Sequence, residues 1–93
     1  MIRLIQCLCP HRHCVAAVAY DDQTDISGEV ARRALKKFIE KHLNAFCGIC
    51  QSRELQYEDQ ATIFKTMEEA KPHLAAAQEL NLRARKILKA RSN

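Results

Sequence analysis

A chain of 93 residues is long enough for one domain and too short for two, so we expect residues 1–93 to form a single domain. Hydrophobic residues make up 47% of the chain and charged residues 28%, which argues against disorder, and the longest apolar run, residues 14–20, is too short to span a membrane. The net charge of +4 permits binding to acidic partners but does not require it.

The five cysteines could belong either to a secreted disulfide scaffold or to a metal site. No signal peptide fits the N-terminus, because a single basic residue, Arg3, precedes a short apolar stretch that Pro10 interrupts. We therefore expect a cytoplasmic protein with reduced thiols, in which closely spaced cysteines bind metal more often than they form disulfides.

The N-terminal segment predicts a β-hairpin. Residues 2–8 and 14–20 are rich in branched side chains, and the polar segment between them contains Pro10, which is typical of a tight turn. A solvated loop follows, in which Asp25 or Ser27 is placed to cap a helix.

An amphipathic helix is expected from residue 30 to about residue 43. Its apolar residues form a stripe two residues wide, at positions 30, 31, 34, 35, 38, 39 and 43, and basic residues occupy the opposite side. Asn44 is a residue type that commonly ends helices, so we expect the helix to stop there.

A second hairpin is expected in residues 53–58 and 61–65, with its turn at Asp59 and Gln60. The chain then has the spacing of a capping box in Thr66 and Glu69, which predicts the start of a second helix.

The second helix is expected to extend to about residue 91. Its apolar stripe includes Met67, Leu74 and Leu80, which we expect to be buried. Toward the C-terminus the stripe thins while basic residues accumulate, so residues 85–93 are expected to project and to take part in homo-oligomerisation or partner binding.

The strongest functional signal is a pair of cysteine and histidine clusters. Cys47 and Cys50 have the spacing of a metal-chelating pair, and Gly48 is expected to let the backbone turn so that both sulfurs face one ion. The second cluster contains Cys7, Cys9, His11, His13 and Cys14. Zinc (Zn2+) in structural sites binds four thiolate or imidazole ligands, so the two clusters together predict a zinc site.

Cys9 and His13 are the expected partners of Cys47 and Cys50. Cys9 begins the turn at Pro10, and His13 follows four residues later to complete a Cys-x3-His pair. Cys7 is the alternative ligand because it shares a strand face with Cys9. Cys14 and His11 are further possible ligands in place of Cys9 or His13.

The two ligand turns resemble those of the broad zinc-ribbon and zinc-knuckle class of small zinc-binding domains. The resemblance covers these turns alone and implies that the metal clamps strands together. The expected fold is therefore α+β, with two β-hairpins and two helices in the order ββαββα. A structural zinc site is expected to join the N-terminal knuckle to the turn after the first helix.

Catalysis is not expected, because the ligand turns contain no carboxylate that could act as a general base and the signatures of zinc hydrolases are absent. The first functional hypothesis is a regulatory module that binds a protein partner. The alternative is a basic zinc-binding domain that binds nucleic acid through its helices. The cations that would contact nucleic acid or another acidic partner are Arg32, Arg33, Lys36, Lys37, Arg83, Arg85 and Lys86.

Overall fold

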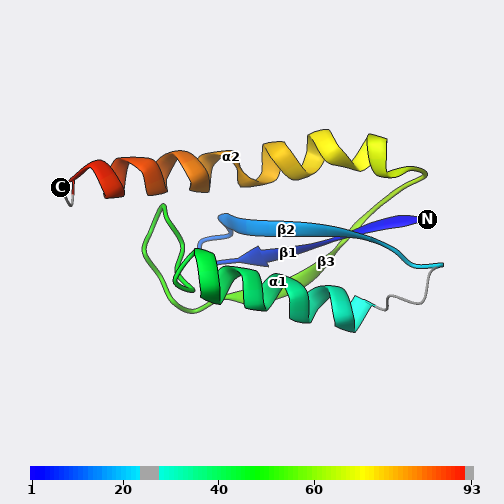
Figure 1. The fold of residues 1–93 in the computed structure, drawn as a ribbon, viewed down its shortest axis with the longest axis horizontal. Helices are drawn as coiled ribbons and strands as arrows, with labels where there is room; N and C mark the ends of the chain where they lie inside the picture. Colours follow the sequence, from blue (N-terminus) through cyan, green and yellow to red (C-terminus); the bar gives the residue numbers. More distant parts are fainter. Residues whose placement is uncertain (24–27, 92–93) are drawn as a thin grey trace.

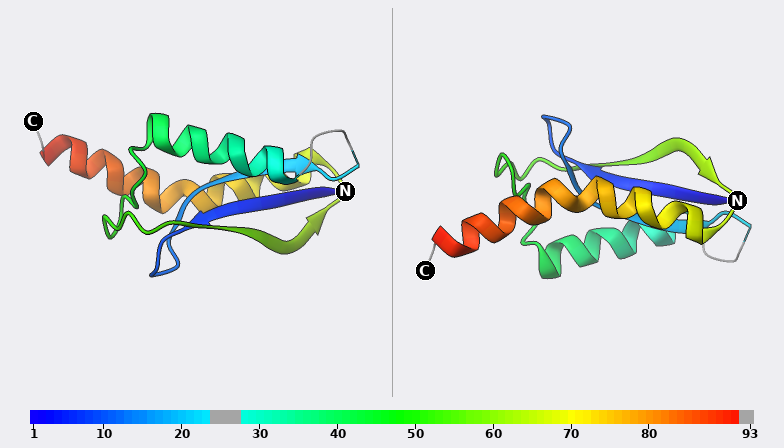
Figure 2. Two further views of the ribbon diagram at one scale, coloured as in Figure 1. Left: turned by 90° about the horizontal axis from the view of Figure 1, so that it is seen from below. Right: turned by 90° about the horizontal axis from the view of Figure 1, so that it is seen from above.

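The computed structural model describes residues 1–23 and 28–91 and shows an α+β fold. Within these residues, three strands form one antiparallel sheet in the order β2-β1-β3, and α1 and α2 cover its opposite faces (Figure 1). The two views in Figure 2 look onto the sheet from its two sides, with α1 nearer the viewer on the left and α2 nearer on the right. In chain order the elements are β1 (Ile2–Leu8), β2 (Cys14–Asp21), α1 (Gly28–His42), β3 (Gln56–Phe64) and α2 (Met67–Arg91).

The central strand β1 supplies both cores, because its apolar residues point to both faces of the sheet. On one face Ile5 and Cys7 pack with α1 through Ala31, Leu35 and Ile39. On the other face the core brings together Ile2, Leu4, Phe64 and Ala70, with Leu74 packed against them. A continuous apolar strand is therefore what permits a helix on each side of so small a sheet.

The first hairpin and the helix ends agree with the sequence-based expectation. Asn44 follows α1 with a φ of 54°, and the amide of Ala45 donates to the carbonyl of Ile39 over 3.1 Å, as in a Schellman cap. At the start of α2 the amide of Glu69 donates to Thr66 Oγ1 over 3.3 Å. The expected caps Asp25 and Ser27 lie outside the described residues.

The expected second hairpin is wrong. Residues 56–64 form one strand, β3, that pairs with β1 along its length. Its register shifts between Ile63, which faces Arg3, and Asp59, which faces Ile5, so β3 carries extra residues at this point. The turn-like residues Asp59 and Gln60 are accommodated as an irregularity in one strand, because both halves of the segment pair with the same edge of β1.

The burial expected along α2 is also largely wrong. Met67 is 39% exposed and Leu80 is 65% exposed, whereas Leu74 is half-buried. The residues of α2 that are fully buried are Ala70 and Asn81. The sheet-facing side of α2 therefore passes through Asn81 rather than Leu80, one position away on the helix.

On α1 one row of the expected two-residue stripe is buried. Ala31, Leu35 and Ile39 face the core, whereas Val30 and Phe38 are about half exposed. α1 packs on β2 and β1, and β2 is an edge strand, so the outer row of the helix lies beyond the sheet. In the described part of the chain, neither helix combines the length and the apolar character that crossing a membrane requires.

Candidate metal centre

Four side chains from two loops converge beside the sheet. Cys9 and His13 lie in the turn between β1 and β2, and Cys47 and Cys50 lie in the segment that follows α1. Their sulfur and imidazole nitrogen atoms all lie within 4.8 Å of one another. These are the four residues that the sequence predicts as ligands, and they could hold a metal ion.

The N-terminal turn is shaped by backbone hydrogen bonds. The amide of Arg12 donates to the carbonyl of Cys9 over 2.9 Å, and the amide of Cys9 donates to the carbonyl of His13 over 3.1 Å. Arg12 takes a left-handed φ of 67°, which reverses the chain. The amide of His13 also donates to Cys9 Sγ over 3.3 Å, and Cys9 Sγ lies 3.4 Å from His13 Nδ1.

The second loop folds in a comparable way. The amide of Gln51, whose φ is 63°, donates to the carbonyl of Cys47 over 2.8 Å, and the amide of Cys47 donates to the carbonyl of Ser52 over 2.9 Å. This turn directs the Cys47 thiol toward the N-terminal turn, where Cys47 Sγ lies 3.8 Å from His13 Nδ1.

The separations fit a tetrahedral ion. Bond lengths of about 2.3 Å to sulfur and about 2.0–2.1 Å to nitrogen imply sulfur-to-nitrogen distances of roughly 3.5 Å in a tetrahedral zinc site. The two distances from His13 Nδ1, 3.4 Å to Cys9 and 3.8 Å to Cys47, lie on either side of that value. Three thiols and one imidazole are also a donor set that soft or borderline metals prefer.

Hydrogen bonds favour the ionised form of one thiol. Burial opposes ionisation of Cys47, but the amides of Cys50 and Ile49 and the side chain of Asn81 outweigh burial and hold the pKa of Cys47 below its ordinary value. At Cys50 the amide of Ser52 lowers the pKa, but burial and the neighbouring thiols of Cys9 and Cys47 raise it further, so its pKa lies above the ordinary value. A bound cation would remove this mutual repulsion and allow all the thiols to ionise.

The other cysteines and His11 lie outside the group of four. Cys7, the alternative ligand, is fully buried in the core on the α1 side, and burial raises its pKa to about 11. Burial likewise raises the pKa of Cys14 to about 11, and its thiol donates to the carbonyl of Ala16. His11 is exposed, with its ring centroid 6.1 Å from that of His13. Cys7 and Cys14 therefore serve as neutral thiols beside the site.

Asn81 of α2 is a residue of this site that sequence reasoning missed. It is fully buried, its Oδ1 accepts a hydrogen bond of 2.6 Å from the amide of Gly48, and its Nδ2 donates to the carbonyl of Cys14 over 2.7 Å. Nδ2 also lies 3.6 Å from Cys47 Sγ. The available signal was its position seven residues after Leu74, which places this polar side chain within the apolar stripe.

Glycine is required at position 48 for a different reason from the expected one. Its φ is not positive, so the turn does not require glycine. A Cβ at this position would lie 2.7 Å from Arg85 Cγ and 2.9 Å from the carbonyl oxygen of Asn81. Glycine is therefore needed because α2 approaches so close to the backbone of residues 43–55, the loop between α1 and β3 that carries Cys47 and Cys50 and is called the ligand loop below.

Arg85 also attaches α2 to the ligand loop. Its guanidinium donates to the carbonyl of Leu43 over 2.9 Å and to the carbonyl of Phe46, and it lies 4.4 Å from the centroid of the Phe46 ring. Sequence analysis placed Arg85 in a projecting terminal segment and on a charged surface. For Arg85 that placement is wrong, because its hydrogen bonds attach it to the segment that follows α1.

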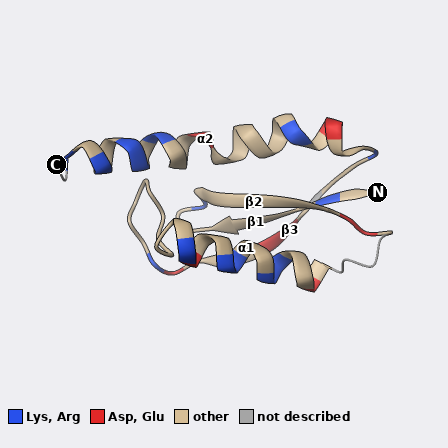
Figure 3. Ribbon diagram, viewed as in Figure 1, with Lys and Arg blue, Asp and Glu red and all other residues tan. Residues whose placement is uncertain are grey.

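The remaining candidate cations do not form one continuous surface. Figure 3 shows them along α1 and along the C-terminal half of α2, which lie on opposite faces of the sheet. Three of them are already in ion pairs, since Arg32 is 3.9 Å from Asp59, Arg33 is 2.9 Å from Glu29 and Arg83 is 2.5 Å from Glu79. The three lysines among these candidates, Lys36, Lys37 and Lys86, are exposed.

Comparison of the chain with known protein families, characterised proteins and solved structures finds no match. The function is therefore argued from the geometry of the site and its surroundings.

Proposed function

We propose that this protein is a small zinc-binding module in which the metal is structural, and that it acts by binding a protein partner. The observation that carries the zinc proposal is the convergence of four nitrogen and sulfur donors, Cys9, His13, Cys47 and Cys50, within 4.8 Å. Zinc is the metal that this donor set and spacing suit best, and four protein ligands would leave no open position for catalysis. A reducing compartment such as the cytoplasm would keep the thiols available.

A metal here would secure two loops that the sheet does not hold. Cys9 and His13 lie beyond the paired residues of β1 and β2, and Cys47 and Cys50 lie in an irregular segment between α1 and β3. Asn81 contacts the ligand loop and would transmit the constraint to α2. The free energy of metal binding would therefore contribute directly to folding.

The proposed protein partner would bind along the free edge of the sheet. Among residues 1–23 and 28–91, β1 is the only strand that pairs with β2, so the other edge of β2 has no strand partner there. A groove of about 270 Å³ lies next to it, and the half-exposed Phe38 of α1 forms one wall. The groove is also lined by Ala17, Val18, Ala34 and Leu35 and, from α2, by Gln78. An extended segment that adds to β2 and places an apolar side chain against Phe38 would fit this surface.

Nucleic-acid binding is the less favoured candidate. The basic residues of the two helices face opposite sides of the molecule, and Arg32, Arg33 and Arg83 are paired with carboxylates. Duplex binding requires a continuous row of cations that can replace counterions.

Elemental analysis of protein purified from zinc-supplemented cells tests the metal proposal. We expect about one zinc per chain, because four ligands complete one structural site. A folded protein with iron, or with no metal despite ample zinc, would refute it.

The partner proposal is tested with Phe38→Asp, which should abolish capture of a partner obtained with the wild-type protein. Lys36→Asp, on the exposed side of α1, is the control.

A further inference from the structure

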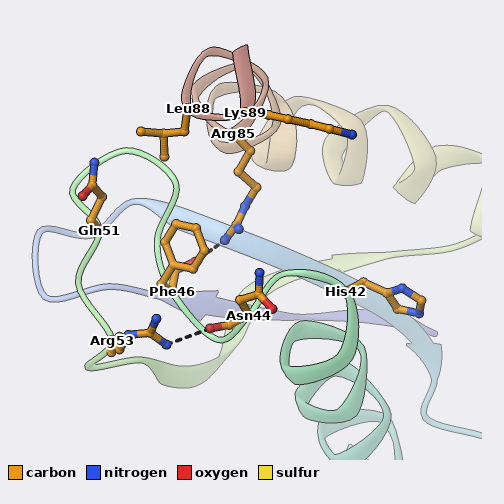
Figure 4. A pocket seen from close by; sticks show the side chains of 8 residues that line it. All are labelled: His42, Asn44, Phe46, Gln51, Arg53, Arg85, Leu88 and Lys89. Atoms are coloured by element: carbon orange, nitrogen blue, oxygen red, sulfur yellow. Dashed lines mark hydrogen bonds between the residues drawn. The ribbon is translucent and has the colours of Figure 1, made fainter. Parts of the chain in front are cut away.

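A pocket of about 750 Å³ lies between the end of α1, the ligand loop and the last turns of α2 (Figure 4). Its volume is within the range of small-molecule sites. The described residues that line it include His42, Phe46, Gln51, Arg53, Arg85 and Lys89, and none of the described lining residues is acidic.

Two guanidinium groups in this pocket lack a carboxylate partner. In the part of the chain that the structure describes, the ion pairs include neither Arg53 nor Arg85. Arg53 donates to the carbonyl of Asn44 over 2.9 Å, and Arg85 donates to the carbonyls of Leu43 and Phe46. These bonds orient the two cations but do not neutralise them.

Arg85 also has hydrogen-bonding capacity to spare. Its Nε is buried and has no hydrogen-bond partner among the described residues, which is costly for a charged group. Burial lowers the pKa of this arginine, so an anion nearby would stabilise its charged form. A guanidinium has five N–H donors, and the carbonyls occupy only some of them in Arg53 and Arg85.

The backbone beside the pocket is held in sparsely populated conformations. Asn44, Ala45 and Gln51 have φ values of 54°, 51° and 63°, and Asn44 and Gln51 line the pocket. At Asn44 and Ala45 this conformation belongs to the cap of α1, and at Gln51 it belongs to the turn after Cys47, so both ends of the segment beside the pocket are fixed by hydrogen bonds. The conformation fixes Phe46 with its ring centroid 5.8 Å from Arg53 and 4.4 Å from Arg85.

We propose that this pocket binds the phosphate group of a phosphate ester, with Arg53, Arg85 and Lys89 as donors and with Phe46 and Leu88 against the organic part of the ligand. A phosphate monoester carries about two negative charges at neutral pH. It therefore matches the charge of the two guanidinium groups better than a ligand with one carboxylate group would. This site shares no residue with the proposed metal ligands or with the groove beside β2, although Phe46 and Gln51 adjoin Cys47 and Cys50 in the sequence, so it adds binding of a small-molecule phosphate monoester to the proposed function.

The test is a titration of the isotope-labelled protein with AMP, followed by the amide resonances. We expect saturable shifts confined to residues 42–53 and 85–89, and no such shifts with adenosine, which lacks the phosphate. Equal binding of adenosine, or AMP shifts that appear instead around Lys36 and Lys37, would overturn the proposal. Because this measurement uses the wild-type protein with its metal content recorded, failure of the zinc proposal would be recognised separately.

A second titration with a short single-stranded oligonucleotide that has no terminal phosphate separates a phosphate monoester from a backbone phosphodiester. We expect weaker binding of the oligonucleotide than of AMP at the same resonances, because each backbone phosphate carries only one negative charge. Equal or tighter binding of the oligonucleotide would overturn the assignment to a phosphate monoester.

Charge-removing variants supply the matched control. Arg53→Gln combined with Lys89→Gln should weaken AMP binding at least about tenfold, because charge-assisted contacts are lost. Lys36→Gln combined with Lys37→Gln removes the same charge from the exposed side of α1 and should leave the affinity unchanged. Equal losses in both double variants would show general electrostatic attraction and no site.

Discussion

The two helices hold the same sheet by different means. α1 packs through a row of apolar side chains, Ala31, Leu35 and Ile39, against the core that contains Ile5 and Cys7. The C-terminal half of α2 instead docks through hydrogen bonds: Asn81 accepts from the amide of Gly48 and donates to the carbonyl of Cys14, and Arg85 donates to the carbonyl of Leu43. The first mode depends on burial of apolar surface. The second depends on loops that the proposed metal would hold in place, so the two helices should respond differently to metal removal.

The largest effect is expected at the metal ligands. Cys50→Ser should unfold the protein or abolish metal retention, because zinc contributes about 10–16 kcal/mol in small domains, comparable to a total stability of about 5–15 kcal/mol. Cys14→Ser is the matched control and should be far milder, since Cys14 lies outside the group of four. Thermal melting and metal analysis of both variants provide the measurement. If Cys14→Ser is as damaging as Cys50→Ser, the assignment of N-terminal ligands is wrong.

The contribution of α1 is tested at its central core residue. Leu35→Ala should lower the free energy of unfolding by about 2–5 kcal/mol, because it leaves a cavity between α1 and the sheet. Phe38→Ala, three residues away and about half exposed, should cost much less. Denaturant unfolding of the metal-loaded protein measures both changes. Equal losses would show that the outer row of α1 is also part of the core.

The contribution of α2 is tested at Asn81. Asn81→Ala should lower stability by about 1–3 kcal/mol, because the amide of Gly48 and the carbonyl of Cys14 would lose their buried partner. It should also weaken metal binding by about 10–100-fold, since Asn81 Nδ2 contacts Cys47 Sγ. Competition with a chelator measures the affinity, with the exposed Glu79→Ala as control. Loss of stability at unchanged metal affinity would assign Asn81 to helix docking alone.

The smallest effect on stability is expected on the outer side of α2. Leu80 and Ile87 are seven residues apart and both exposed, so they share one face of the helix and are candidates for self-association. Leu80→Gln with Ile87→Gln should reduce dimerisation in sedimentation experiments and change the stability of the monomer by less than about 1 kcal/mol. A wild-type protein that is monomeric at every concentration would remove this surface as an oligomer interface.

The cluster of Cys9, His13, Cys47 and Cys50 could be predicted from the sequence, because the Cys-x2-Cys spacing and the turn at Pro10 determine locally where Cys9 and Cys47 lie. The strand β1 and the cap at Asn44 follow from equally local patterns. The single strand β3 does not, since whether residues 56–64 turn or continue is decided by the edge of β1 that they pair with.

The packing of α2 could not be predicted for the same kind of reason. Hydrophobicity favours Leu80 as the buried residue. Asn81 is buried instead because it bonds to the amide of Gly48 and the carbonyl of Cys14, and only the complete fold brings these two groups next to α2. Gly48 shows the same dependence, because the group that excludes a larger residue is the backbone of α2.

X-ray absorption at the zinc edge of the metal-loaded protein tests the central claim most directly. Cys9, His13, Cys47 and Cys50 predict a first shell of three sulfur atoms at about 2.3 Å and one nitrogen at about 2.0–2.1 Å, with His13→Cys converting the shell to four sulfurs. A wild-type shell of four sulfurs would show that Cys7 or Cys14 replaces His13. A shell with two sulfurs and oxygen from water would contradict a closed structural site.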